Sequence, residues 1–199
     1  MSTPTTRGIL IRWPSWYDVM NRFLFLGRER QFRERTIDLA AITRGHTVLD
    51  VGCGTGNLTM AAKVRTGIDG EVFGIDPSPE MIQEAERKAA EDQLDISYRV
   101  GLIEDIPYPD GKFDVVVSSL MLHHLPKDLK RQGIAEISRV LKPGGRFVAV
   151  DIDPPLVGNL RIVEEAMRTN GFAGIRRGRT TFRVMFLLIH YVGGSAGRE

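Results

Sequence analysis

The chain has 199 residues, of which 42% are hydrophobic, with a formal net charge of +2 and one cysteine, Cys53. This composition supports one hydrophobic core and excludes an internal disulfide framework and a cysteine-based metal cluster. Positive and negative charges are interspersed, which disfavours a nucleic-acid partner. The apolar runs are too short for a signal-peptide core or a membrane span, and one cysteine suits a reducing compartment. We therefore expect a single cytoplasmic domain spanning residues 1–199.

Residues 1–45 are expected to form an N-terminal helical cap, because residues 15–42 follow helical spacing with a break near Gly27. The segment also combines aromatic residues with arginines, a composition suited to a membrane surface as well as to packing on the core. These residues are Trp13, Trp16, Phe23, Phe25, Arg12, Arg22 and Arg28. Peripheral membrane contact therefore stands as an alternative to a purely structural cap.

Residues 46–192 alternate between strand and helix patterns, and residues 193–199 are expected to be a flexible tail. Ser78 and Pro79 predict a capped helix start, and Lys142-Pro143-Gly144-Gly145 predicts a helix end. Strands are predicted at residues 47–51, 71–75, 96–100, 113–118, 146–150, 175–182 and 184–192, with helices at 57–65, after 78, after 126 and at 157–169. This order predicts an α/β, Rossmann-like, doubly wound, mostly parallel seven-stranded sheet with an antiparallel closing strand.

A glycine-rich loop follows the first predicted strand, at Gly52, Gly54 and Gly56. Glycines at a strand-to-helix turn let the backbone approach a ligand, but this spacing differs from the G-x-G-x-x-G of dinucleotide sites. Asp50 lies just before the loop, where a carboxylate repels a pyrophosphate and attracts the ammonium and sulfonium groups of S-adenosylmethionine. The charge therefore favours S-adenosylmethionine as the cofactor.

Asp76 lies 20 residues after Gly56, at the end of the second predicted strand. A carboxylate there is placed to accept hydrogen bonds from both hydroxyls of a ribose. Because NAD also carries a ribose, this residue supports nucleoside binding without choosing the cofactor. The alternative is that Asp76-Pro77 is only a helix-entry turn.

These motifs, taken in order over residues 48–150, resemble the class I S-adenosylmethionine-dependent methyltransferases. The resemblance implies that the glycine loop, with Thr55, holds the methionine part of the cofactor and that Asp76 holds the ribose. It also implies that residues 101–107 frame the adenine. Where similar enzymes carry Asp or Asn against the adenine amino group, this chain has Leu102. The backbone of Ile103 and the carboxylate of Glu104 or Asp105 are the alternative contacts.

The fourth predicted strand runs into Ser119, His123 and His124, at the sheet edge where ligands bind in such folds. Methyl transfer depends mainly on alignment, so a base is needed only where the acceptor loses a proton, and histidine suits that task. Ser119 is expected on the cofactor side, and the two histidines are candidate catalytic residues. The alternative is a loop histidine bonded to backbone. No metal site is expected, because adjacent side chains diverge and His46 and His190 are remote in sequence.

The segment Tyr17-Asp18-Val19-Met20-Asn21 is similar to the Y-D-x-M-N entry of the ubiquinone/menaquinone biosynthesis C-methyltransferases. This resemblance implies that Tyr17 and Asn21 lie over the acceptor, and His124, at the sheet edge, is the third expected acceptor contact. Two departures distinguish the chain: Leu120 to His124 replace the F-G-L-R-N of that family, and the segment after the fifth strand is shorter. We therefore expect a small, apolar acceptor, which can be a quinone, a lipid or another small molecule.

Two other functions remain open at this point. An NAD-dependent oxidoreductase is favoured by Asp76 and disfavoured by Asp50, by the glycine spacing and by the lack of a tyrosine-lysine pair. A non-catalytic cofactor-binding module would keep the fold without turnover, and Leu102 favours it. Nothing in the sequence specifies an oligomeric state.

Overall fold

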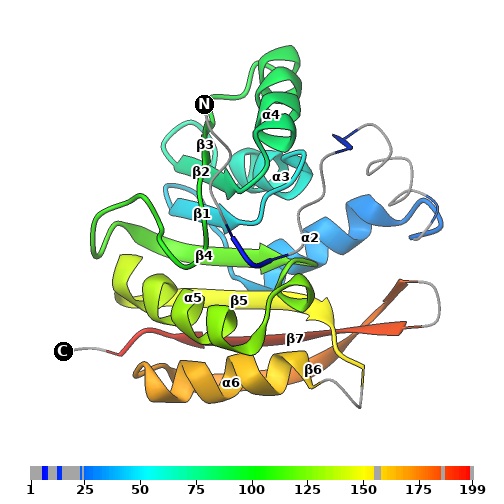
Figure 1. Ribbon diagram of the computed structural model, residues 1–199. Helices are drawn as coiled ribbons and strands as arrows, with labels where there is room; N and C mark the ends of the chain where they lie inside the picture. Colours follow the sequence, from blue (N-terminus) through cyan, green and yellow to red (C-terminus); the bar gives the residue numbers. More distant parts are fainter. Residues whose placement is uncertain are drawn as a thin grey trace.

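The structure is a computed structural model that describes residues 6–8, 13–14, 23, 25–154, 158–184 and 187–197. Its centre is a seven-stranded sheet with the strand order β3-β2-β1-β4-β5-β7-β6 (Figure 1). The strands are β1 (Thr47–Val51), β2 (Glu71–Asp76), β3 (Ser97–Val100), β4 (Phe113–Ser119), β5 (Leu141–Ile152), β6 (Ala173–Val184) and β7 (Leu187–Ser195). Strands β1 to β5 pair in parallel, whereas β7 is antiparallel to both β5 and β6. The predicted Rossmann-like fold is confirmed, including the antiparallel strand.

The helices begin and end where the sequence provides local signals. Ser78 caps the helix that starts at Pro79, since its hydroxyl accepts the Met81 N–H at 3.2 Å. Gly56 and Gly158 precede two other helices with left-handed backbones, which a glycine adopts at little cost. The helices are α2 (Glu29–Leu39), α3 (Asn57–Thr66), α4 (Pro79–Glu91), α5 (Lys127–Val140) and α6 (Asn159–Thr169), with a 3-10 turn, η1 (Leu122–His124).

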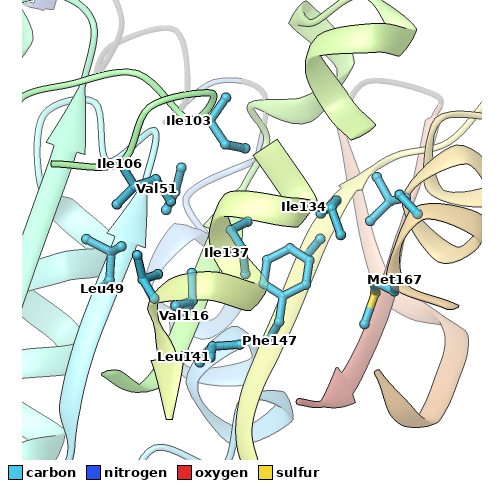
Figure 2. Close-up of a cluster of buried hydrophobic side chains, with 14 of the residues drawn as sticks. Leu49, Val51, Ile103, Ile106, Val116, Ile134, Ile137, Leu141, Phe147 and Met167 are labelled. Atoms are coloured by element: carbon cyan, nitrogen blue, oxygen red, sulfur yellow. The ribbon is translucent and has the colours of Figure 1, made fainter. Parts of the chain in front are cut away.

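The two faces of the sheet carry separate hydrophobic layers. Helices α5 and α6 cover one face, where Ile134, Ile137 and Met167 pack against Leu49, Val116 and Phe147 (Figure 2). Helices α2 and α3 cover the other face, and their buried side chains include Phe32, Ile37, Leu58 and Ala62. Both layers are almost inaccessible to water, so the central strands are held firmly and their carboxyl ends form a rigid edge.

Strand β1 pairs with β2 on one side and with β4 on the other. The strand order therefore reverses at β1, and the loops after β1 and β4 diverge from this point. Ligands bind in the crevice that such a reversal opens at the carboxyl ends of parallel strands. The fold thus brings the loops that follow β1, β2, β3 and β4 to one edge.

Several predicted boundaries differ from the structure. Strand β5 begins directly after α5, β6 is longer than predicted, and β7 lies three residues further along the chain than predicted. The prediction of a flexible tail over residues 193–199 is wrong for residues 193–195, because they pair with Phe147, Val148 and Arg146 on β5. In the predicted cap, α2 is described, and most of residues 15–24 lie outside the described residues. None of the helices among the residues that the structure describes has the length and apolarity that crossing a membrane requires.

Candidate cofactor and acceptor site

The loop after β1 turns through three left-handed glycines, Gly52, Gly54 and Gly56, with φ angles of 75°, 53° and 79°. The N–H groups of Gly52 and Cys53 both donate to the Ile75 carbonyl, at 2.8 and 3.0 Å, which ties the loop to β2. A Cβ atom on Gly52 would lie 2.4 Å from Cγ of Met121, so a side chain there is excluded twice, by backbone conformation and by contact. The predicted glycine loop is therefore a tightly fixed turn at the sheet edge.

Asp76 ends β2 and holds this loop from the side. Its Oδ2 accepts the Gly54 N–H at 3.0 Å and its Oδ1 accepts the Ser78 N–H at 2.9 Å. Burial raises the pKa of Asp76 to about 6, and the two backbone hydrogen bonds oppose that rise. Each carboxylate oxygen retains lone pairs for a further donor, such as a hydroxyl of a diol.

A first cavity extends from Asp76 across the ends of β1, β2 and β4, with a volume of about 70 Å³. Its walls are largely apolar, and its polar groups are the Asp76 and Glu104 carboxylates, the Thr6 hydroxyl and the His124 ring. The lining residues are Thr6, Gly8, Val51, Gly52, Gly54, Ile75, Asp76, Pro77, Met81, Gly101, Leu102, Ile103, Glu104, Leu120, Met121, His124 and Leu125. This combination of apolar walls and few polar groups is typical of a small-molecule site.

The segment after β3 divides its side chains between the core and this cavity. Ile103 is 6% exposed and packs against Gly133 of α5, so its side chain belongs to the core (Figure 2). Leu102 and Glu104 line the cavity, and Glu104 Oε1 accepts the Thr6 hydroxyl at 2.9 Å. Asp105 is exposed and is not among the lining residues. Of the two carboxylates proposed to replace the usual acidic contact, Glu104 is the one that faces the cavity.

A second cavity of about 470 Å³ lies on the other side of the glycine loop. Two phenylalanines and two leucines form its apolar part, and α2 contributes a carboxylate and a guanidinium. The lining residues are Phe25, Gly27, Glu29, Phe32, Arg33, Asp50, Gly52, Cys53, Thr55, Asn57, Leu58, Ser119 and Leu120. Gly52 and Leu120 line both cavities, so the two cavities are neighbours at the switch point between β1 and β4.

Asp50 is the charged group beneath the second cavity and is only 1% exposed. The Thr59 hydroxyl donates to its Oδ2 at 2.7 Å. Burial raises the pKa of Asp50 to about 7; the Thr59 hydrogen bond opposes the rise and the nearby Asp76 carboxylate adds to it. A cation in this cavity would favour the charged form of Asp50, because opposite charges attract strongly where water is excluded.

The two histidines have different surroundings, and neither lines the second cavity. The buried carboxylate of Asp151 binds His123 twice, to its N–H at 2.9 Å and to its Nδ1 at 2.6 Å. His123 lines neither cavity and anchors η1 to the end of β5. His124 lines the first cavity, and burial, together with the neighbouring His123 ring, lowers its pKa. The structure therefore brings His124, and not His123, to the candidate site.

Residues 6–8 cross the first cavity, a feature that the sequence did not indicate. The Thr6 hydroxyl bonds Glu104, Arg7 forms an ion pair with Asp128 of α5, and Gly8 lies against Leu125. These partners are about 100 or more residues away in the chain, so no local sequence pattern predicts the contacts. Tyr17 and Asn21, the predicted acceptor contacts, lie outside the described residues.

Within the described ranges, no group of three or more histidine, cysteine, aspartate or glutamate side chains is arranged to hold a metal ion. The central ionisable groups of the site are the Asp50 and Asp76 carboxylates, at the ends of adjacent parallel strands, and further ionisable groups around them are Glu104 and His124 in the first cavity and Glu29 and Arg33 in the second. With the glycine loop, they define the ligand site of a Rossmann-like nucleoside-binding domain.

Comparison with known proteins identifies the family within this class. A family described as a methyltransferase domain matches residues 48–145. A demethylmenaquinone methyltransferase of Thermus thermophilus is 35% identical over 147 residues, which cover 74% of this chain and 66% of that relative. One from Bacillus licheniformis is 35% identical over 139 residues, covering 70% of this chain and 59% of the relative. The chain thus spans less than two thirds of the length of these relatives.

A solved structure shows the same fold. The S-adenosylmethionine-dependent methyltransferase from Aquifex aeolicus superposes with a TM-score of 0.70 at 24% sequence identity, covering 92% of this chain and 98% of that protein. Residues 48–145 therefore belong to the methyltransferase-domain family, and the chain is related to the demethylmenaquinone methyltransferases. The resemblance predicted from the sequence is confirmed.

The raised pKa of Asp50 makes a prediction about stability. An unfolded Asp ionises near pH 3.8 and the folded one near pH 7, so the unfolded state binds fewer protons between these values. The free energy of unfolding should therefore fall as the pH rises from about 4 to about 7, by up to about 4 kcal/mol from this group. Asp50→Asn keeps an oxygen for Thr59 and should be more stable than the wild type at pH 8.

Urea unfolding of both proteins at pH 5 and pH 8 measures this effect. The advantage of Asp50→Asn should be larger at pH 8, because the wild type then carries a buried charge. A difference between the two proteins that stays constant with pH would show that Asp50 titrates normally.

Proposed function

We propose that this chain transfers the methyl group of S-adenosylmethionine to a small apolar acceptor of the quinone type. The observation that supports this most directly is that two cavities of different character meet at Gly52 and Leu120. The first has the Asp76 carboxylate, placed to accept ribose hydroxyls, and the second has a buried carboxylate at its base and phenylalanines in its wall. An in-line transfer needs donor and acceptor spaces that join in this way, because alignment provides much of the rate enhancement.

In this proposal, S-adenosylmethionine supplies a methyl group activated by a positively charged sulfur. Asp76 accepts the ribose hydroxyls, and the Gly52–Gly56 backbone with Thr55 supports the methionine part. Asp50 and Ser119 line the side where the ammonium group is held. Around the adenine, the proposed contacts are the backbone of Ile103 and the side chains of Leu102 and Glu104. The Asp50 charge opposes a pyrophosphate, which argues against NAD as the ligand.

The acceptor is proposed to share the second cavity with the methionine part of S-adenosylmethionine, which lies on the side of Asp50, Thr55 and Ser119. The cavity volume of about 470 Å³ lies in the range of small-molecule sites, and Phe25 and Phe32 offer aromatic faces to a flat ring. Glu29 and Arg33 provide polar groups for ring oxygens. The relatives named demethylmenaquinone methyltransferases support a quinone-like ring. By resemblance, Tyr17 and Asn21 are proposed to complete the acceptor contacts.

His124 is proposed to take the proton that an acceptor hydroxyl or ring carbon loses. It lines the first cavity, whose wall includes Gly52 and Leu120, the two residues shared with the second cavity. Its lowered pKa keeps the imidazole neutral at pH 7, and a neutral imidazole can accept a proton. His123 is assigned the positioning role, because Asp151 binds both its backbone and its ring.

A cytoplasmic location is also proposed. The single cysteine, Cys53, is buried and unpaired, so the cysteine content provides no disulfide that would call for an oxidising compartment.

Labelled methyl transfer to a short-chain naphthoquinol tests the proposed function. The wild type should transfer the label, and Asp76→Ala should raise the KM for S-adenosylmethionine at least about tenfold, because charged hydrogen bonds to the ribose are lost. Asp105→Ala is the matched control, since this exposed carboxylate lies on the same edge outside both cavities. No transfer to any quinol by the wild type, or equal effects of both variants, would contradict the proposal.

His124→Ala should lower kcat about a hundredfold while leaving the KM for S-adenosylmethionine within a few-fold, as expected for loss of a proton acceptor. The fall in kcat at acid pH should also disappear in the variant. His46→Ala is the control, because His46 is held by Thr43 at the opposite edge of the sheet. A pH profile of kcat that is unchanged by His124→Ala would show that another group accepts the proton from the acceptor.

A further inference from the structure

Asp151 is a buried carboxylate near the carboxyl end of β5 and lines neither cavity. Its Oδ2 accepts the His123 N–H at 2.9 Å, and its Oδ1 accepts the Ile152 N–H at 2.7 Å. Oδ1 also lies 2.6 Å from Nδ1 of the His123 ring. Two of these three contacts are to one residue, so Asp151 holds His123 by its backbone and by its side chain.

The contact with the ring determines where His123 carries its hydrogen. A carboxylate oxygen offers only lone pairs, so the ring nitrogen beside it must carry a hydrogen to form the bond. A neutral His123 ring therefore has its N–H at Nδ1 and its lone pair at Nε2. A carboxylate that binds an imidazole in this way fixes both the tautomer and the orientation of the ring.

The His123 ring lies against the His124 ring. The two ring centroids are 3.9 Å apart, and the ring planes are inclined by 45°. His123 thus contacts both Asp151 and His124, whereas only His124 reaches the first cavity. A His123 ring that Asp151 holds in place restricts the rotation of the His124 ring, because its atoms already fill the neighbouring space.

Other charged groups surround His124. Across the first cavity it faces the Asp76 and Glu104 carboxylates. The backbone N–H groups of Gly54 and Ser78 bind Asp76, and the Thr6 hydroxyl binds Glu104. The remaining charged groups nearby are exposed to water, which screens them: Arg7, Lys127 and Asp128.

The Asp151 charge acts on His124 as well as on His123. Burial and the neighbouring His123 ring lower the pKa of His124, and the Asp151 carboxylate opposes that fall. The buried Lys130 of α5 donates to Asn159 at 2.7 Å and also lies near Asp151, so its positive charge offsets part of the Asp151 charge. Asp151 nevertheless favours the charged form of the His124 imidazole.

We propose that Asp151 is a positioning residue for methyl transfer, which orients the His124 imidazole through the His123 ring and stabilises the imidazolium that forms when His124 accepts a proton. This inference rests on the proposed role of His124 as the proton acceptor. In that step the methyl carbon bonds to the acceptor, the sulfur keeps the electron pair of the bond that breaks, and the acceptor proton passes to a lone pair of the His124 ring. A buried carboxylate suits this role because little water screens its charge.

Nuclear magnetic resonance of the full chain with isotope-labelled histidine, without S-adenosylmethionine or acceptor, tests the arrangement. In the wild type, neutral His123 should carry its hydrogen on Nδ1. Asp151→Asn keeps the size of the side chain and removes its charge, so the pKa of His124 should fall. Single histidine variants assign the signals.

Asp153→Asn is the matched control. Asp153 is also buried, just after the same strand, and its oxygens bind α6 and β6 instead of η1. Burial lowers the pKa of His190, and the Asp153 charge opposes that fall. Asp153→Asn should therefore lower the pKa of His190 and leave that of His124 unchanged.

Methyl transfer to a short-chain naphthoquinol provides a second readout. Asp151→Asn should lower kcat about tenfold and leave the KM for S-adenosylmethionine within a few-fold, because the proton acceptor is weakened while the cofactor contacts remain. His123→Asn keeps an N–H for Asp151 and removes the ring, so it should fold and also lower kcat. It replaces Asp151→Asn in this assay if that variant does not fold.

Three results would overturn the proposal: a His124 pKa that is unchanged in Asp151→Asn or falls equally in Asp153→Asn, a wild-type His123 with its hydrogen on Nε2, or a kcat that His123→Asn leaves unchanged. The resonance measurements need neither cofactor nor acceptor. A wild type that transfers no methyl group would therefore contradict the proposed function and leave the test of the Asp151 contacts intact.

Discussion

The site depends on two buried carboxylates, Asp50 and Asp76, which lie at the carboxyl ends of adjacent parallel strands. Burial makes their charged forms costly in free energy. Burial raises the pKa of Asp50 to about 7 and that of Asp76 to about 6, so the charged form of each carboxylate is less stable here than in water. The fold tolerates this because β1 and β2 lie in a rigid sheet, with both faces closed by hydrophobic layers. A ligand that brings positive charge and hydroxyl donors relieves the cost, so the same two groups favour cationic nucleosides.

Much of this arrangement could be predicted from the sequence because its causes are local. Ser78 and Pro79 carry their own helix signal, and the three glycines mark a turn that only glycine adopts without strain. The alternation of predicted strands with predicted helices then indicates a parallel sheet, and it places Asp50 and Asp76 at the same edge of that sheet. These features need information from only a few neighbouring residues.

The features that sequence reasoning missed depend on distant contacts. His123 looked equivalent to His124, but a carboxylate 28 residues away, Asp151, fixes it to β5. Residues 193–195 have a loop-like composition, yet they pair with Arg146, Phe147 and Val148 and so extend β7. The Thr6–Glu104 hydrogen bond joins residues 98 positions apart. No periodic pattern encodes such pairings, because they arise only when the folded chain brings the partners together.

The chain spans less than two thirds of the length of the relatives that it matches, and the described residues line both cavities. The two spaces differ in volume and lining: the first, of about 70 Å³, has the Asp76 carboxylate in its wall, and the second, of about 470 Å³, has the Phe25 and Phe32 rings. Their junction at Gly52 and Leu120 is fixed by the left-handed glycine and by the Met121 side chain that lies on it.

The most direct test of the central claim is calorimetric titration of the purified protein at pH 8 with S-adenosylmethionine and, in a separate experiment, with NAD. The account predicts saturable binding of S-adenosylmethionine alone, because Asp50 attracts a cationic ligand and repels a pyrophosphate. Saturable binding of NAD alone would contradict the account and assign the site to a redox cofactor.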